Sequence, residues 1–312
     1  MAIAIAHGIV FRRADYGEYD SDHYYLYSDL DSEQYSREAL KIQSGENTLT
    51  GYLYGTDNTQ GLIVISPGHR YANDVKLYEI TYFVDAGWMV LCYDYTGSYN
   101  SEGSSMVGYS QAVHDLDAVL DYVKNEKQFQ SLPVVLFGHS LGAYASAAVL
   151  QYGHDIKSAI VASGSDMPKE QWEYSIERYI GIFHYVLKPF TKLFISIKYG
   201  DEVNLSAVDG INSVDIPVLV ISGTDDIFYG GESPIYKKRY TIKNTNCIFI
   251  LKNAEKHNGH YDYFLTDSAV EYETFVSSKT FSGEIDKALY AQHDVSFMDS
   301  LNRFFWDSVL TK

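Results

Sequence analysis

Short apolar runs recur along the chain from residue 61 onward. They lie at 61–66, 88–94, 132–138, 156–162, 216–222 and 247–252. The runs do not alternate strictly between apolar and polar residues, which is typical of strands buried on both faces. Helices are predicted between most of them, notably at 107–125 and 141–152. The pattern predicts an α/β fold in which helices cover both faces of a mostly parallel sheet of about eight strands.

Two further predicted segments lie before and after the region in which strands and helices alternate. Residues 38–55 predict a β-hairpin that turns at Ser44-Gly45-Glu46-Asn47. The last predicted helix, 295–310, places Met298, Leu301 and Phe305 on one apolar face. Both segments add to the predicted core, which we assign to residues 36–163 and 214–312. Residues 1–35 are polar and tyrosine-rich, and we expect an N-terminal extension packed on this core. The sequence gives no role to these residues or to 277–294.

One interval is too long for an ordinary connection, because about 50 residues separate the strand ending near Ala162 from the strand starting at Ile216. We predict a lid or cap at 164–213 that covers an active site. The alternative is a set of extra helices that only enlarges the core. The large apolar and aromatic residues of this interval are Trp172, Tyr174, Tyr179, Ile180, Phe183, Tyr185, Phe190, Phe194 and Tyr199.

The hydrophobic content and net charge of the chain limit the classes of partner that it can bind. The 312 residues are 46% hydrophobic, which is enough for a large core and excludes a disordered chain. The formal net charge of −17 argues against nucleic acid and anionic membranes, because both require concentrated Lys and Arg. It also argues mildly against a polyanionic substrate.

The two cysteines and the N-terminus indicate a reducing compartment. Cys92 and Cys247 each lie in an apolar run, which predicts buried strand thiols and no disulfide framework. The apolar start of the chain is followed by Arg12-Arg13, the reverse of a signal peptide, and no stretch reaches 18 apolar residues. We therefore expect a cytoplasmic protein without a membrane span, whose oligomeric state the sequence does not give.

The pentapeptide Gly138-His139-Ser140-Leu141-Gly142 is the strongest candidate for chemistry. An apolar run precedes it and an alanine-rich, helix-forming segment follows it. G-x-S-x-G between a strand and a helix is the context of a nucleophile elbow, in which the serine hydroxyl lies at the helix N-terminus. About 0.1 such matches are expected by chance in a chain of this length. Ser140 is therefore the predicted nucleophile.

The elbow and four further segments resemble the α/β-hydrolase superfamily from about residue 37 to the C-terminus. These segments are Ile63-Val64-Ile65-Ser66-Pro67-Gly68-His69, the stretch from Gly87 to Gly103, Ile216 to Asp226, and Asn258-Gly259-His260. Pro67 stands where the family usually has His. The resemblance implies an α/β-hydrolase fold with a helical lid and the chain order Ser140, Asp226, His260. It also implies that the backbone N–H groups of His69 and Leu141 form the oxyanion hole.

Neighbouring residues offer alternatives to these assignments. The resemblance favours Asp226 over Asp225 as the acid and His260 over His257 as the base. His257, His260 and Asp262 are also close enough in sequence for a metal site, but no other cluster completes a shell. We expect no metal and no organic cofactor.

Two further positions are assigned structural roles. Ser110 lies in a near copy of the elbow, and we interpret it as a helix N-cap because no strand precedes it. His139 is expected to pack against neighbouring strands rather than to act in catalysis.

The resemblance implies hydrolysis of a carboxylic ester through an acyl-enzyme, as in carboxylesterases and lipases. Because the predicted lid is aromatic and the protein is acidic, we expect an uncharged substrate of small or medium size. A serine peptidase of the proline-iminopeptidase or prolyl-oligopeptidase type is the alternative, with lid acids as candidate anchors for a peptide terminus. These acids are Glu170, Glu173, Glu177, Asp201 and Glu202. A non-catalytic binding protein on the same fold is a third possibility, which labelling of Ser140 by a fluorophosphonate would test.

Overall fold

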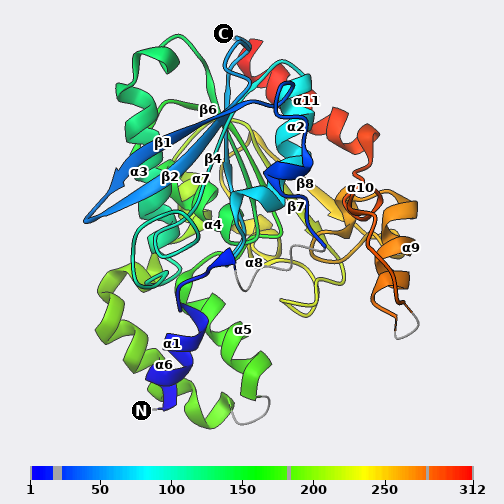
Figure 1. Cartoon of the computed structure of the whole chain (residues 1–312). Coiled ribbons are helices and arrows are strands. Elements are labelled where there is room, and N and C mark those ends of the chain that lie inside the picture. The colour runs from blue at the N-terminus through cyan, green and yellow to red at the C-terminus, as the bar shows by residue number, and fades with distance from the viewer. Residues whose placement is uncertain (1, 17–22, 181–183, 279–280, 311–312) are drawn as a thin grey trace.

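The computed structural model describes residues 2–16, 23–180, 184–278 and 281–310, and it omits side-chain detail at 176–185. Within these residues the strands form one eight-stranded sheet in the order β1-β2-β4-β3-β5-β6-β7-β8 (Figure 1). The strands are β1 (Arg37–Ser44), β2 (Asn47–Tyr54), β3 (Leu62–Ser66), β4 (Met89–Tyr93), β5 (Val134–His139), β6 (Ile156–Ala162), β7 (Val218–Gly223) and β8 (Cys247–Lys252). The predicted hairpin corresponds to β1 and β2.

The sheet is parallel from β4 to β8, and β2 joins β4 in antiparallel orientation. This confirms the predicted mostly parallel sheet. The carboxyl ends of β3, β5, β7 and β8 therefore lie along one edge of the sheet. Loops at that edge carry the predicted site residues, as is usual for open parallel sheets.

Helices cover both faces of the sheet, and each face has its own apolar cluster. The helices are α1 (Ala2–Val10), α2 (Leu77–Asp85), α3 (Gln111–Asn125), α4 (Leu141–Ala148), α5 (Pro168–Ile180), α6 (His184–Tyr199), α7 (Ala207–Asn212), α8 (Pro234–Lys237), α9 (Asp267–Val276), α10 (Lys287–Tyr290) and α11 (Val295–Leu310). One cluster includes α3 and α4, and the other includes α2 and α11. Met298, Leu301 and Phe305 of α11 are fully buried, as predicted.

The long interval between β6 and β7 contains α5, α6 and α7. α7 packs against α4 of the central layers, whereas α6 packs against α5 and α1 (Figure 1). The ring of His7 on α1 stacks on Trp172, with centroids 5.4 Å apart, and also contacts Phe194. Phe183 lies outside the described residues, as do the side chains of Tyr179, Ile180 and Tyr185. The division into extension, core and lid stays a prediction.

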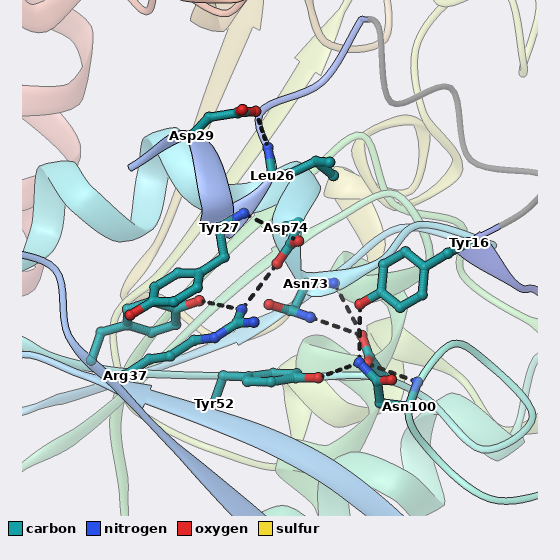
Figure 2. A network of polar contacts seen from close by, with 11 residues as sticks. Tyr16, Leu26, Tyr27, Asp29, Arg37, Tyr52, Asn73, Asp74 and Asn100 are labelled. Atoms are coloured by element: carbon teal, nitrogen blue, oxygen red, sulfur yellow. Dashed lines mark hydrogen bonds and ion pairs between the residues drawn. The ribbon is translucent and has the colours of Figure 1, made fainter. Parts of the chain in front are cut away.

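A polar network fastens the N-terminal segment to the central layers (Figure 2). The guanidinium of Arg37 lies between the rings of Tyr27 and Tyr52, at 3.8 and 4.3 Å from their centroids. The same group donates to Asp74 Oδ1 at 3.2 Å, and the backbone N–H of Tyr27 donates to Asp74 Oδ2 at 3.4 Å. Cation–π contacts and an ion pair thus hold residues near Tyr27 against β1 and β2.

Asp94, directly after β4, lies at the centre of the same network and is fully buried. Asn73 donates to it from both its backbone and its side chain, each at 3.1 Å. Asn100 donates a third hydrogen bond through its backbone and reaches Tyr16 through its side chain. Burial raises the pKa of the Asp94 carboxyl to about 6, although these donors oppose the shift.

Two local predictions need correction. Ser110 stands at the N-cap position of α3, but its hydroxyl donates to Glu202 Oε2 at 2.8 Å and does not cap the helix. Cys247 is only half-buried because it begins β8 at the edge of the sheet, whereas Cys92 is fully buried in β4. Among the described residues, we find no helix with the length and apolar character needed to cross a bilayer.

Candidate active site

The pentapeptide around Ser140 forms a tight turn between β5 and α4. Ser140 has φ 57° and ψ −116°, a sparsely populated conformation that costs about 1–3 kcal/mol. A Cβ at Gly138 would lie 2.2 Å from Gly142 O, and a Cβ at Gly142 would lie 1.9 Å from Ser66 O. Only glycine fits at these two positions. The turn therefore presents Ser140 at the N-terminus of α4, where backbone N–H groups favour negative charge.

His260 and Asp226 lie together at the same edge of the sheet. His260 Nδ1 is 2.6 Å from Asp226 Oδ2. The carboxylate is fully buried, and its other oxygen accepts the backbone N–H of Phe228 at 2.9 Å. A carboxylate only accepts hydrogen bonds, so Nδ1 of His260 donates to Asp226 and Nε2 is the ring nitrogen that remains for proton transfer.

The loop that carries His260 is held close to the end of β7. The backbone N–H of Asp225 donates to Asn258 O at 2.8 Å. A Cβ at Gly223 would lie 2.1 Å from Asn258 O and 2.2 Å from Gly259 O. Glycine at this position therefore allows the two segments to approach closely enough for the contact between His260 and Asp226.

The structure separates the alternative acid and base from this pair. His257 Nε2 lies 2.7 Å from Asp267 Oδ1, and its Nδ1 lies 3.0 Å from Asp262 O. Asp225 is exposed, whereas Asp226 is buried against His260. Since His257 and His260 bind different carboxylates, they do not converge with Asp262. Within the described residues, no group of three His, Cys, Asp or Glu side chains is arranged to hold a metal ion.

His69 lies in the loop that follows β3. Burial, reinforced by the charge of Arg70, lowers the pKa of His69 to about 4, so its ring is neutral near pH 7. The ring lies between Phe11 and Tyr109, with centroids 5.7 Å from each. His69, Leu141, Ser140 and His260 all line one cavity.

This cavity has a volume of about 800 Å³. Tyrosine is the most frequent residue in its lining, with Tyr24, Tyr25, Tyr71, Tyr78, Tyr109, Tyr229, Tyr261 and Tyr290. Phe228 also lines it and packs on the catalytic candidate His260, with ring centroids 4.4 Å apart. These rings offer both apolar faces and hydroxyl groups to the cavity.

Two walls of the cavity come from segments to which the sequence assigned no role. Ile9 and Val10 of α1 contribute from the N-terminus, followed by Tyr24 and Tyr25. The region between α10 and α11 contributes His293. Sequence reasoning missed these residues because they lie outside any motif. Their only signal was the abundance of tyrosine in residues 1–35.

His139 contacts the loop that carries His260, a contact that the sequence did not predict. Its Nε2 lies 2.9 Å from the carbonyl oxygen of His260. Burial and the nearby Lys76 charge lower the pKa of His139 well below its ordinary value, so the ring is neutral. A carbonyl only accepts, so Nε2 carries the hydrogen and ties the elbow to the backbone of His260.

A buried cluster lies beneath the same loop. Lys76 Nζ donates to Glu79 Oε1 at 2.7 Å, and Tyr261 Oη donates to the same oxygen at 3.0 Å. Tyr261 Oη also lies 2.9 Å from His293 Nε2. Burial alone would raise the pKa of Glu79, but Lys76 and His293 hold it well below its ordinary value. Tyr261 follows His260 directly and packs on His139, with ring centroids 5.1 Å apart, so this cluster and His139 together hold the loop.

A family model and one curated protein are similar in sequence to this chain. The sequence model of the family described as "Serine aminopeptidase, S33" (Hydrolase_4) matches residues 57–208, just under half of the chain. The "Uncharacterized protein YqkD" of Bacillus subtilis (strain 168) is 25% identical over 233 residues, which cover 72% of this chain and 74% of that protein.

Solved structures share the fold at low sequence identity. The Pyrococcus furiosus esterase Pf2001 superposes with a TM-score of 0.61 at 15% identity and covers 89% of this chain and 94% of its own. Est1E from Butyrivibrio proteoclasticus, solved with ferulic acid bound, gives a TM-score of 0.51 at 18% identity and covers 76% of this chain and 96% of its own. At this level of identity, the likeness establishes the fold.

Proposed function

We propose that this chain, which has the fold of the α/β hydrolases, is a serine hydrolase of carboxylic esters. One observation carries the proposal. Ser140, held in a strained turn at the head of α4, shares a cavity with His260, which is hydrogen-bonded at 2.6 Å to the buried Asp226. This arrangement suits nucleophilic attack on an acyl carbon.

In the proposed reaction, Ser140 Oγ attacks the ester carbonyl while His260 Nε2 takes the hydroxyl proton. Asp226 holds the ring through Nδ1 and stabilises the imidazolium that forms. The carbon–oxygen bond to the alcohol then breaks, and His260 returns the proton to the leaving alcohol. Water attacks the acyl-enzyme by the same route and releases the acid together with the free serine.

The negative charge that develops on the carbonyl oxygen needs donors already in place. We propose the backbone N–H groups of Leu141 and His69 for this role. Leu141 opens α4 next to Ser140, and His69 lines the cavity beside it. Each such donor is worth about 3 kcal/mol of transition-state stabilisation.

The cavity supports an uncharged substrate of small or medium size. Its volume of about 800 Å³ accommodates a drug-sized molecule. Gln171 and Ser175 of α5 line it, which supports a lid role for part of 164–213. In this proposal, the lid and the N-terminal helix together cover the bound ester.

A serine aminopeptidase is the second candidate, because the matching family model is described by that name. Two of the five lid acids named from the sequence are already paired with lysines, which does not favour it. Glu170 pairs with Lys238, and Glu173 pairs with Lys188 and Lys192. The acids that do line the cavity include Asp225, Asp262 and Glu273, and they are the remaining candidates to bind an amino terminus.

The test compares kcat/KM for p-nitrophenyl esters from acetyl to dodecanoyl with kcat/KM for amino-acyl p-nitroanilides. We expect ester turnover that falls about 10⁶-fold in Ser140→Ala, with an optimum chain length that reports the acyl pocket. Preference for anilides would favour the peptidase. Absence of turnover and of fluorophosphonate labelling at Ser140 in folded protein would favour a binding protein.

A further inference from the structure

The part of the cavity that helix α5 borders carries polar side chains close to the candidate nucleophile. Gln171 and Ser175, four residues apart on one face of α5, both line it, and His69 lines it from the loop after β3. We call these three residues the lid-side arm. Gly68, which precedes His69, lies beside Ser140, because a Cβ on that glycine would be 3.8 Å from Ser140 Cβ. A substrate bound at Ser140 therefore shares one cavity with the lid-side arm.

The His69 ring has one nitrogen without a hydrogen-bond partner. The backbone of Val10 accepts a hydrogen bond from this ring. Nε2 is buried and contacts no donor or acceptor among the described residues, so the nitrogen that donates to Val10 is Nδ1. Burial holds the pKa of His69 at about 4, and the ring is neutral near pH 7. Nε2 therefore carries a lone pair and can only accept a hydrogen bond.

The side-chain oxygen of Gln171 is a second buried acceptor that no described residue satisfies. The hydroxyl groups beside it cannot serve it. Ser175 donates its hydrogen to the backbone oxygen of Gln171 at 2.9 Å. In the 2.9 Å contact between Tyr109 Oη and Ser175 Oγ, Tyr109 must therefore be the donor. Since each hydroxyl has one hydrogen, neither has another to give to Gln171 Oε1 or to His69 Nε2.

These two acceptors are exceptions in a folded protein. Nearly all buried polar groups are hydrogen-bonded, and an exception indicates either a role or a missing partner. Both atoms belong to walls of the cavity that contains Ser140, and both need a donor. The residues of the lid-side arm are uncharged near pH 7, so a neutral donor is sufficient. An alcohol hydroxyl on the substrate has this chemistry.

We propose that the lid-side arm selects esters that carry an alcohol hydroxyl, which donates to His69 Nε2 or Gln171 Oε1 while the reacting carbonyl lies at Ser140. The inference rests on the proposed esterase function and names the class of its uncharged substrate. Neighbouring side chains cover both acceptor atoms, and substrate binding displaces them. An ester with a methyl group in place of the hydroxyl leaves the acceptors unpaired, so its transition state is bound less well.

The test compares kcat/KM within two pairs of esters in which a hydroxyl replaces a methyl group. The glycol monoester of butyric acid against propyl butyrate places the change in the alcohol. The p-nitrophenyl ester of ω-hydroxyhexanoic acid against that of heptanoic acid places it in the acyl group. We expect the wild type to favour the hydroxylated ester of one pair about tenfold or more.

Variants of the two acceptors assign that preference. We expect it to fall in Gln171→Met or in His69→Phe, whichever removes the acceptor used, and to be absent from the double variant. Gln128→Met is the matched control, because Gln128 is exposed and lies outside the cavity lining, and it should keep the wild-type preference. Equal kcat/KM within both pairs for the wild type, or a retained preference in the double variant, would overturn the proposal.

Thermal unfolding distinguishes substrate selection from a structural role. Methionine and glutamine have similar helix propensities, and the replaced oxygen has no partner, so Gln171→Met should not lower the melting temperature. If the Gln171 amide instead turned over and donated to His69, the variant would melt at a lower temperature with an unchanged preference. That result would also overturn the proposal.

Calorimetric titration of Ser140→Ala with the same esters measures the lid-side arm without turnover. Tighter binding of a hydroxylated ester, lost when Gln171→Met and His69→Phe are added, would support the proposal. If the wild type then hydrolysed no ester and resisted fluorophosphonate labelling, the esterase function alone would be rejected. Equal binding within both pairs would reject the lid-side arm as a selective site, whether or not the wild type hydrolyses esters.

Discussion

Gly223 controls the distance between the acid and the base of the candidate site. In Gly223→Ala, the new Cβ would lie 2.1 Å from Asn258 O and 2.2 Å from Gly259 O, whereas ordinary contact begins at 3.4 Å. The carbonyl groups must therefore move away by roughly 1.2 Å (3.4 − 2.2). His260 directly follows Gly259, so displacement of the Gly259 carbonyl moves the His260 ring away from Asp226.

The expected loss follows from this displacement. A misplacement of about 1 Å in a catalytic group costs about 10²-fold in rate. The hydrogen bond from Asp225 N to Asn258 O, 2.8 Å long, also weakens, at a cost of about 1 kcal/mol in stability. We therefore expect kcat for Gly223→Ala to fall about 100-fold while the protein remains folded.

The assay is kcat on a p-nitrophenyl ester together with the rate at which a fluorophosphonate labels Ser140, both measured below the melting temperature. Gly283→Ala is the control, because a Cβ there meets nothing closer than 3.7 Å, and it should match the wild type. A folded Gly223→Ala protein whose kcat stays within about threefold of the wild type would refute the argument from close approach.

Three further predictions concern the same edge of the sheet. Asp226→Asn should lower kcat about 10⁴-fold with little change in KM, because the amide no longer holds the required tautomer of His260; an unchanged pH–rate profile and kcat would contradict this. His139→Phe removes the donor to the His260 carbonyl and should lower both kcat and the melting temperature, with His139→Gln retaining more of each. The carboxyl of Asp94 has a pKa raised to about 6 by burial, so the folded state binds its proton more tightly than the unfolded state. The resulting stabilisation, roughly 3 kcal/mol, is present below about pH 3.8 and is lost as the pH rises through about 6. Urea unfolding from pH 4 to 7 should therefore show a smaller decline in Asp94→Asn than in the wild type.

The strands and the mostly parallel character of the sheet could be predicted from the sequence because each strand carries its own local signal, whereas the strand order could not. Runs such as 134–137 and 159–162 are continuous and apolar, since helices cover both faces of the strands that contain them. The partial exposure of Cys247 could not be predicted from its apolar run. It depends on the position of β8 at the sheet edge, which an apolar run does not encode.

The same distinction applies to the candidate site, where residues in local motifs could be predicted and contacts between distant segments could not. Ser140, Asp226 and His260 are each marked by short motifs at strand ends, and the structure places Asp226 against His260 as the chain order suggested. The roles of these residues stay a prediction. The contact of His139 with the His260 backbone and the cluster around Glu79 arise between segments distant in sequence. No pattern within one segment indicates such pairings.

The cavity wall that joins the two ends of the chain has a consequence for biosynthesis. Tyr24 and Tyr25 lie in the same lining as Tyr290 and His293, and an ion pair between Asp29 and Lys287 spans 258 residues. A ribosome makes the first of these segments long before the last, and contacts of such separation form late because loop closure is costly. Most strands of the sheet can therefore pair before the N-terminal and C-terminal segments meet to complete this wall of the cavity. Substrate selectivity should therefore mature after the sheet has formed, so a nascent or partly refolded chain would acquire its fold before its specificity.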